Sequence, residues 1–148
     1  IVIMVNKWDL IENKETNSVR DYENAIKRRI SPFNDVPILF ASALEKQRIF
    51  KAVELLMKVH KNRTQKIKTS ELNEVMQEAM EKYPPPAHRG RLIKIKYVTQ
   101  LPTYFPSFAF FCNHPKHVKE SYRNYLENQL RESFDLTGVP INVHFREK

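Results

Sequence analysis

The sequence predicts an α/β protein in two parts, a β-α-β-α unit in residues 1–66 and an α-β-β-α-β unit in residues 69–148. Three observations support this division. In the first part, two short apolar runs flank a helical segment, which is typical of parallel strands buried on both faces. In the second part, strands with alternating apolar and polar residues indicate a sheet with one exposed face. Between them, residues 58–68 hold five cations and no acidic residue, as in a linker.

The first part begins with the apolar run Ile-Val-Ile-Met-Val at residues 1–5. Apolar residues at helical spacing predict a helix at 17–30, and a second apolar strand is predicted at 36–40. A further helix is predicted from 49 to 60. A strand-helix-strand succession of this kind predicts parallel strands joined by a right-handed crossover. Two strands and two helices cannot cover both faces of a parallel sheet, so we expect a truncated unit.

The second part has the pattern of a small sheet covered on one face by two helices. Its strands alternate or are wholly apolar, and each helix carries an apolar stripe. Gly138 suits the turn that leaves the second helix. The predicted elements are a helix at 69–82, strands at 93–97 and 108–112, a helix at 115–134 and a strand at 139–145. We therefore expect a three-stranded sheet with two helices on one face.

The composition excludes several classes of protein. The 148 residues contain only two glycines, Gly90 and Gly138, which lie too far apart to share a motif. This excludes a Walker A loop, a G-x-G-x-x-G loop, a kinase glycine-rich loop and a G-x-S-x-G elbow. The single cysteine excludes an internal disulfide and favours a cytoplasmic location. No apolar run approaches the ~18 residues of a membrane span, so no membrane association is expected.

A polar loop directly after the first strand has the pattern N-K-x-D, with Asn6, Lys7 and Asp9. Ligands of open α/β sheets bind at the carboxyl ends of the strands. A carboxylate at Asp9 accepts from both the N1–H and the N2 amino group of guanine, a paired and charge-assisted contact. The Lys7 stem can lie along the base, and Asn6 can bond the base edge and tie neighbouring loops together. We expect Trp8 to be partly exposed beside this loop.

The second predicted strand ends in a similar way, with Phe-Ala-Ser-Ala-Leu at residues 40–44. Because the two strands are predicted to be adjacent and parallel, their loops should be neighbours. The small residues Ser42 and Ala43 allow close approach, and the Ala43 N–H is placed to donate to guanine O6. Together, the two loops indicate the guanine-specificity half of a GTPase G domain.

With these motifs in place, the whole chain resembles the C-terminal portion of the Der (EngA) family of bacterial tandem Era-like GTPases. NKWDL and FASAL resemble the end of its second, Ras-like G domain. TSELNEVMQEAMEKYPPPAHRGRLIKIKYVTQ, PSFAFFCN, SYRNYLENQLRESF and GVPINVHFR resemble its KH-like domain. The resemblance implies a G-domain part in residues 1–66, a KH-like domain in residues 69–148, and GTP hydrolysis in assembly of the large ribosomal subunit. It also implies two partners, the ribosome with its large-subunit rRNA and the other G domain of the same protein.

The resemblance places the phosphate loop, the Mg²⁺-binding Ser/Thr and the switch segments upstream of these residues. GTP or GDP and Mg²⁺ would thus bind the intact protein partly through residues absent here. Phosphoryl transfer depends on positioning and charge around the phosphates and Mg²⁺. We therefore expect no catalytic residue in this chain and no GTPase activity from it alone. Contacts to the base alone predict GDP binding in the ~1 mM range or weaker.

A second expectation is that the chain binds RNA through lysine and arginine side chains. KH domains clamp the RNA backbone with a G-x-x-G loop, which this chain cannot contain. Exposed cations can meet rRNA phosphates instead, with binding that weakens as salt rises; the alternative is a solvated basic surface. A further alternative function is a non-enzymatic RNA- or protein-binding module acting through the KH-like domain. The candidate cations are Lys58, Lys61, Arg63, Lys66, Lys68, Arg89, Arg91, Lys94 and Lys96.

Two further expectations concern metals and pairing between chains. Cys112, His114 and His117 read as C-x-H-x-x-H, but Cys112 falls on a core strand and no fourth ligand is evident, so no metal site is expected. Residues 1–5 should expose a strand edge, because the truncated sheet lacks neighbours. We expect another chain, or upstream residues of the gene, to cover that edge.

Overall fold

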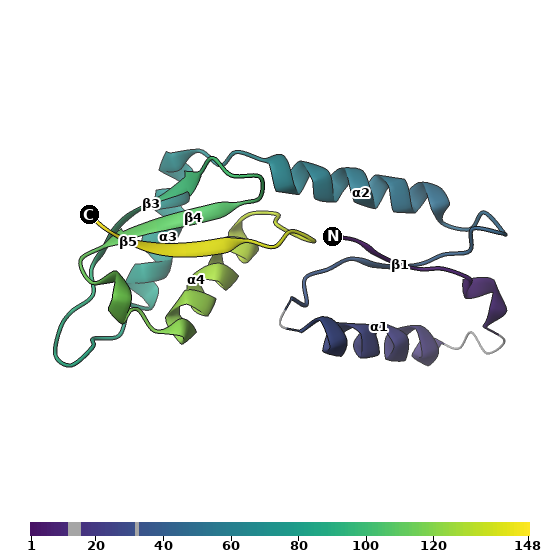
Figure 1. Cartoon of the computed structure of the whole chain (residues 1–148), viewed down its shortest axis with the longest axis horizontal. Coiled ribbons are helices and arrows are strands. Elements are labelled where there is room, and N and C mark those ends of the chain that lie inside the picture. The colour runs from purple at the N-terminus through teal and green to yellow at the C-terminus, as the bar shows by residue number, and fades with distance from the viewer. Residues whose placement is uncertain (12–15, 32) are drawn as a thin grey trace. The chain divides into compact units, whose positions relative to one another are not determined.

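The computed structural model describes residues 1–11, 16–31 and 33–148 (Figure 1). The chain divides into two compact units. Unit 1 comprises Ile1–Asn62 and Thr137–Pro140, and unit 2 comprises Arg63–Leu136 and Ile141–Lys148. The predicted mixed α/β class is confirmed, because helices and β-strands occur in both units. Within the described residues, no helix combines the length and the apolar character that crossing a membrane requires.

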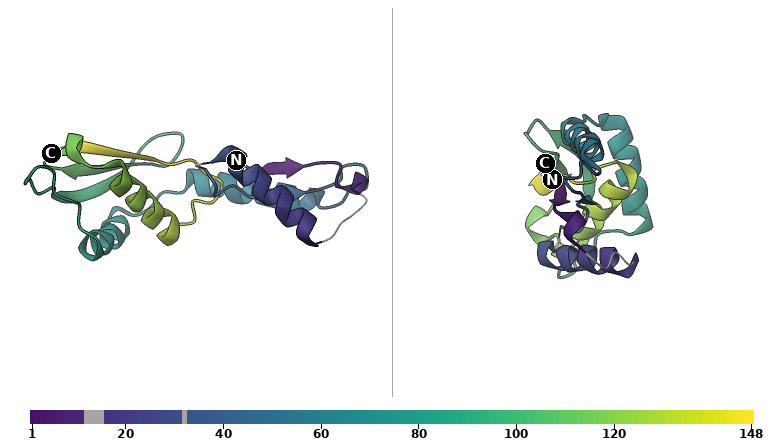
Figure 2. Two further views of the ribbon diagram at one scale, coloured as in Figure 1. Left: turned by 90° about the horizontal axis from the view of Figure 1, so that it is seen from below. Right: turned by 90° about the vertical axis from the view of Figure 1, so that its right-hand side faces the viewer.

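Unit 1 is built on two short parallel strands, β1 (Ile3–Val5) and β2 (Ile38–Phe40). Their register pairs Ile3 with Ile38 and Val5 with Phe40. The helices α1 (Thr16–Ile30) and α2 (Ile49–Thr64) lie on opposite sides of the strand pair (Figures 1 and 2). The helix between the strands in sequence is the crossover that a parallel pair requires.

Trp8 anchors the interior of unit 1, contrary to the expectation that it is partly exposed. It opens the 3-10 helix η1 (Trp8–Leu10) and is only 6% exposed. Its ring lies 4.5 Å from that of Phe40 and 5.7 Å from that of Tyr22, with the Tyr22 ring edge-on. The turn after β1 thus directs the indole against β2 and α1, where burying an aromatic side chain stabilises by about 1.5–3 kcal/mol.

A segment remote in sequence completes unit 1. Thr137–Pro140 follow the last helix of the chain but belong to this unit. The Gly138 N–H donates to Asp35 O at 2.7 Å, and the Gly138 carbonyl accepts a bond from the N-terminal amino group of Ile1. Asn62 Nδ2 donates to Thr137 O at 3.2 Å. Gly138 has φ +75°, a conformation that favours glycine.

Unit 2 contains a three-stranded sheet in the order β3-β4-β5. β3 pairs antiparallel with β4, and β4 pairs parallel with β5. The strands are β3 (Ile95–Leu101), β4 (Ser107–Cys112) and β5 (Asn142–Glu147); the helices are α3 (Thr69–Lys82), the 3-10 helix η2 (Pro115–His117) and α4 (Glu120–Ser133).

The core of unit 2 lies between the two α-helices and the sheet. Each helix contributes residues three or four positions apart, the spacing of a helical stripe, and β4 and β5 contribute alternate residues. β4, the central strand, is apolar on both faces and is the most deeply buried. The fully enclosed side chains include Leu72, Met76, Val98, Phe108, Phe110, Tyr122, Leu126 and Leu130.

Several element boundaries differ from prediction, and the largest differences are in unit 2. The last strand, expected over 139–145, runs over Asn142–Glu147, because Val139 and Pro140 belong to unit 1. The helix expected over 115–134 is interrupted, because Val118 and Lys119 have extended backbones and separate η2 from α4. Proline suits a first helical turn, but α4 starts only at Glu120. The first strand of unit 2, β3, begins at Ile95 rather than residue 93, because the Lys94 N–H bonds the Asn113 side chain at 2.9 Å.

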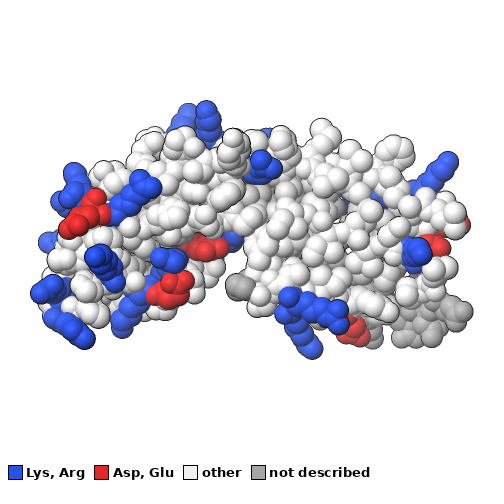
Figure 3. All heavy atoms as spheres, in the orientation of Figure 1, with Lys and Arg blue, Asp and Glu red and all other residues white. Residues whose placement is uncertain are grey.

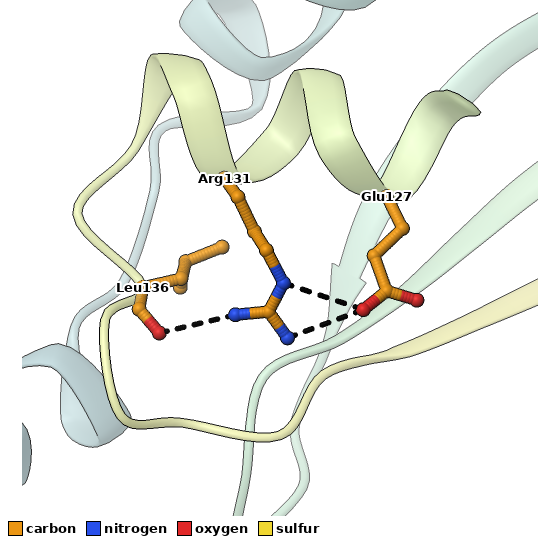
Figure 4. Close-up of polar contacts among 3 residues, drawn as sticks. All are labelled: Glu127, Arg131 and Leu136. Carbon is orange, nitrogen blue, oxygen red and sulfur yellow. Dashed lines mark hydrogen bonds and ion pairs between the residues drawn. The ribbon is translucent and has the colours of Figure 1, made fainter. Parts of the chain in front are cut away.

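In unit 2, side-chain hydrogen bonds stabilise the C-terminal end of α4 and the outer edge of β3. Arg131 donates from Nε and Nη2 to Glu127 Oε1 at 3.3 and 3.2 Å, and from Nη1 to Leu136 O at 3.4 Å (Figure 4). This fastens the chain that leaves α4. At the open edge of β3, Asn73 accepts from Val98 N at 2.9 Å and donates to Val98 O at 2.8 Å. The amide thus pairs with Val98 as a neighbouring strand would.

Candidate functional site

The candidate site consists of two loops at the carboxyl ends of β1 and β2. Backbone hydrogen bonds continue beyond the strands, from Ala41 N to Val5 O at 2.9 Å and from Trp8 N to Ala41 O at 3.1 Å. These bonds hold the start of each loop beside the other. The parallel pairing of β1 and β2 therefore brings the N-K-x-D loop and the F-A-S-A-L loop together at one edge.

A side-chain bond joins the two loops farther out. Asn6 Oδ1 accepts from the Ala43 N–H at 3.0 Å. Ser42 beneath it is fully buried, and its Oγ accepts from Glu45 N at 3.1 Å. The Ser42 backbone also exchanges two bonds with Gln47, at 2.9 and 3.3 Å. The second loop is thus a closed turn that presents Ala43 at the surface.

Lys7 shapes the first loop through its backbone. It has φ 61° and ψ 34°, a left-handed conformation that costs about 1–2 kcal/mol for a residue with a side chain. The turn leaves Asn6 and Lys7 exposed, sends Trp8 inward and places Asp9 half-buried in η1. Strained residues of this kind cluster at ligand sites. The loop therefore offers an ammonium, an amide and a carboxylate on one short stretch.

The structure also shows features of the second loop that the sequence did not predict. Arg48 donates from Nη1 to Phe40 O at 3.0 Å, which braces the end of β2. Lys46 and Arg48 have φ of 54° and 60°. Neither residue belongs to a type that signals positive φ, so no local pattern predicts this conformation. The Ala43 N–H is engaged by Asn6 here, so a base carbonyl would have to share or replace that bond.

The nine candidate cations are all exposed. Lys58 and Lys61 lie on α2 in unit 1, and the other seven lie in unit 2. Figure 3 shows Lys and Arg side chains spread over unit 2 with acidic side chains among them. Arg63 is held in place, because its Nε donates to Tyr104 O at 2.9 Å.

The residues of the C-x-H-x-x-H stretch differ in burial. Cys112 is fully buried on β4, and burial raises the pKa of its thiol, with Glu147 adding to the rise and a backbone bond from His114 opposing it. His114 and His117 are only partly buried, near η2. Among the residues that the structure describes, no group of three or more His, Cys, Asp or Glu side chains is placed to hold a metal.

Unit 1 is a parallel α/β unit with polar loops gathered at the carboxyl edge of its strands, the edge where open α/β sheets bind ligands. Unit 2 is a separate α+β unit. Residues 66–146 match the family described as the KH-domain-like, C-terminal region of EngA bacterial GTPase enzymes. This match covers more than half of the chain, and the chain therefore belongs to that family.

Curated relatives match over the whole chain. The chain is 55% identical over 148 residues to GTPase Der of Christiangramia forsetii and 55% identical over 148 residues to GTPase Der of Flavobacterium johnsoniae. It is 56% identical over 149 residues to GTPase Der of Bacteroides fragilis. Each match covers 100% of this chain and 34% of the relative, so the chain spans about a third of their length.

Proposed function

We propose that residues 1–66 are the guanine-recognition part of a G domain, with a Ras-like parallel β-α-β-α arrangement, and that residues 69–148 are a KH-like domain. The intact protein would bind and hydrolyse GTP in the cytoplasm during assembly of the large ribosomal subunit. One observation carries this proposal: the N-K-x-D and F-A-S-A-L loops lie side by side, joined by the Asn6–Ala43 bond. The curated relatives are named GTPase Der, which supports the proposal.

Each group of the site would have a separate task. Asp9 accepts two hydrogen bonds from guanine, which adenine cannot supply in that arrangement. The Lys7 stem covers one face of the base while its ammonium stays in water. Asn6 joins the two loops by accepting a bond from the Ala43 N–H, and the carbonyl of the base would share or replace that bond. The buried Ser42 keeps Ala43 at the surface.

The chain by itself is proposed to be inactive. Mg²⁺ and the triphosphate would be held by residues outside these 148, since none of the loops here is a phosphate loop. Without phosphate contacts, GDP should bind at about 1 mM or more weakly, which corresponds to about 4 kcal/mol. GTP turnover by the isolated chain that is lost in Asp9→Ala would contradict this part of the proposal.

The exposed apolar residues of unit 1 support a larger G domain. On α2, Phe50 is 85% exposed and Met57 is 68% exposed, and Ile1 beside β1 is 57% exposed. Apolar faces of this kind are normally covered. We propose that the rest of the G domain covers α2 and the free edge of β1. Contact with the other G domain, or pairing with a second chain, would use the same unit.

A second function is proposed for unit 2, in which the exposed cations contact phosphates of large-subunit rRNA. Seven of the nine candidate cations lie there. Binding by counterion release falls steeply with salt, by a factor that grows with the number of phosphates contacted. A filter-binding assay with large-subunit rRNA tests it. Affinity that stays constant from low to high salt would contradict it.

The primary proposal is tested with the intact gene product. Its GTP turnover and its stoichiometry of bound GDP are measured for the parent and for Asp9→Ala. We expect one class of guanine-nucleotide sites to be lost, while Asp21→Ala, a substitution on the exposed face of α1, changes neither quantity. Equal stoichiometry in Asp9→Ala and the parent would contradict the assignment.

A further inference from the structure

Two short segments of unit 2 bring three histidines and two arginines together. The first is the turn from His88 to Arg91. Its ends exchange two backbone bonds, His88 N to Arg91 O at 3.0 Å and Arg91 N to His88 O at 2.9 Å. The central residues Arg89 and Gly90 have φ of 48° and 76°, the left-handed pair of a primed hairpin turn. The turn is therefore a closed structure rather than an open loop.

The second segment is η2, with the residue that precedes it. Asn113, directly before this segment, makes three hydrogen bonds to the residues that precede β3. Its N–H donates to Lys94 O at 3.3 Å, its Oδ1 accepts from Lys94 N at 2.9 Å, and its Nδ2 donates to Leu92 O at 3.0 Å. His117 N–H then donates to His114 O at 3.1 Å. Both histidine-bearing segments are thus held by hydrogen bonds.

The imidazole rings meet between these segments. The His88 and His117 rings are stacked, with centroids 4.5 Å apart and planes within 8° of parallel, and the His114 ring lies 6.1 Å from His117. The pKa of His117 is lowered, first by burial and then by the charges of His88, Arg91, His114 and Arg89. All four of those neighbouring groups are cationic or can become so. None of the groups whose charges act on His117 is a carboxylate. β5 packs against η2 and carries one acid, Glu147, whose charge acts on Cys112.

We propose that the cluster of His88, Arg89, Arg91, His114 and His117 is a binding site for a phosphate group, specifically a phosphodiester of RNA. Arginine binds tetrahedral oxyanions through paired N–H donors, and a protonated imidazole adds a charge-assisted bond. A phosphate among these side chains supplies a counter-charge that favours the protonated form of His117. This site lies in unit 2 and is independent of the guanine-binding proposal. It gives the proposed RNA contact a defined location.

Binding at this site should depend on pH, whereas binding through lysine contacts should not. A bound anion favours the protonated form of His117 and raises its pKa. Binding therefore takes up a proton, and affinity rises as pH falls toward the pKa of the free site. Each proton taken up gives up to about tenfold in affinity per pH unit. Lysine and arginine contacts do not titrate between about pH 5.5 and pH 7.5, so they give no such dependence.

The test measures binding of a ten-nucleotide uridine RNA and, separately, of sulfate to the full chain at pH 5.5 and 7.5 and constant ionic strength. Neither probe changes its own charge in this range, so proton uptake belongs to the protein. His117→Asn is compared with His144→Asn, which alters an exposed histidine on β5 of the same unit. The ring signals of the histidines are followed by NMR in parallel, which also shows that each variant is folded.

We expect the parent and His144→Asn to bind the RNA at least about fivefold more tightly at pH 5.5 than at pH 7.5. In His117→Asn, the ratio of the RNA affinity at pH 5.5 to that at pH 7.5 should fall most of the way to one. In the parent, bound RNA should raise the pKa of His117 in the NMR titration. Equal affinities at the two pH values, or the same loss in both variants, would overturn the proposal. Binding of sulfate but not RNA would assign the site to a small free oxyanion and overturn the RNA assignment.

Discussion

Replacing Gly138 by alanine should destabilise unit 1 more than the same change at Gly90 destabilises unit 2. Both glycines have nearly the same backbone conformation, with φ of +75° and +76°. An alanine there costs about 1 kcal/mol for the left-handed backbone alone. At Gly90 nothing lies within 4 Å of an added Cβ. Gly90→Ala therefore measures the backbone term without a steric one.

At Gly138 an added Cβ would lie 2.7 Å from Val59 Cγ2, 2.8 Å from Ile1 O and 3.1 Å from Pro37 Cδ. One of these atoms is a backbone oxygen, so relief requires the main chain to shift. Overpacking of this kind costs about 1–3 kcal/mol. Together with the backbone term, Gly138→Ala should lower the free energy of unfolding by about 2–4 kcal/mol.

Urea unfolding measures both changes, with the fluorescence of Trp8 and far-UV circular dichroism as signals. Trp8 is the only tryptophan and lies buried in unit 1, so its transition reports on that unit. Gly138→Ala should move the Trp8 midpoint to lower urea, and Gly90→Ala should leave it in place. If Gly138→Ala costs no more than Gly90→Ala, then Thr137–Pro140 do not pack in unit 1 as described.

Three further predictions concern unit 2. Asn73→Ala removes both bonds to Val98 and a third to Thr69 O, and should cost about 3 kcal/mol, at about 1 kcal/mol per bond. The control is Gln77→Ala, one turn along the exposed side of α3. Equal urea midpoints for the two variants would refute the edge-pairing role of Asn73. Cys112 should react with a disulfide reagent only on unfolding, because it is buried and its thiol pKa is raised; prompt labelling of the native chain would contradict its burial. The pKa of His117 is lowered in the folded state from its usual 6.5, so the unfolded chain binds that proton more readily. The free energy of unfolding should therefore fall as pH drops below about 6.5 and be unaffected above it. Urea midpoints measured from pH 5 to 7.5 should depend less on pH in His117→Asn. An unchanged slope of midpoint against pH in that variant would contradict the prediction.

The patterns that allowed prediction were local and periodic. The alternation along β5 marks a half-exposed strand, and the apolar run of β4 marks a buried one. The helical stripe of α3 predicted its bounds, Thr69–Lys82, correctly. The N-K-x-D loop was evident because its residues are contiguous in sequence. Elements with many consistent local signals can thus be placed from sequence alone.

The features that sequence did not predict depend on distant contacts. Trp8 was expected to be partly exposed, but Phe40 and Tyr22 from two other elements enclose it. The joining of Thr137–Pro140 to unit 1 rests on Asp35 and Ile1, more than a hundred residues away. The stacking of His88 on His117 likewise requires the turn and η2 to meet in space. No local periodicity encodes such pairings.

The central claim is that Asp9 reads guanine, and a change of base specificity tests it most directly. Xanthine carries a carbonyl where guanine carries its N2 amino group, so an amide at this position can donate where a carboxylate can only accept. In the intact gene product, Asp9→Asn should lose GDP binding at one class of sites by at least about tenfold, or about 1.4 kcal/mol, and gain binding of xanthosine diphosphate there. Unchanged GDP binding with no gain for xanthosine diphosphate would contradict the assignment of this loop.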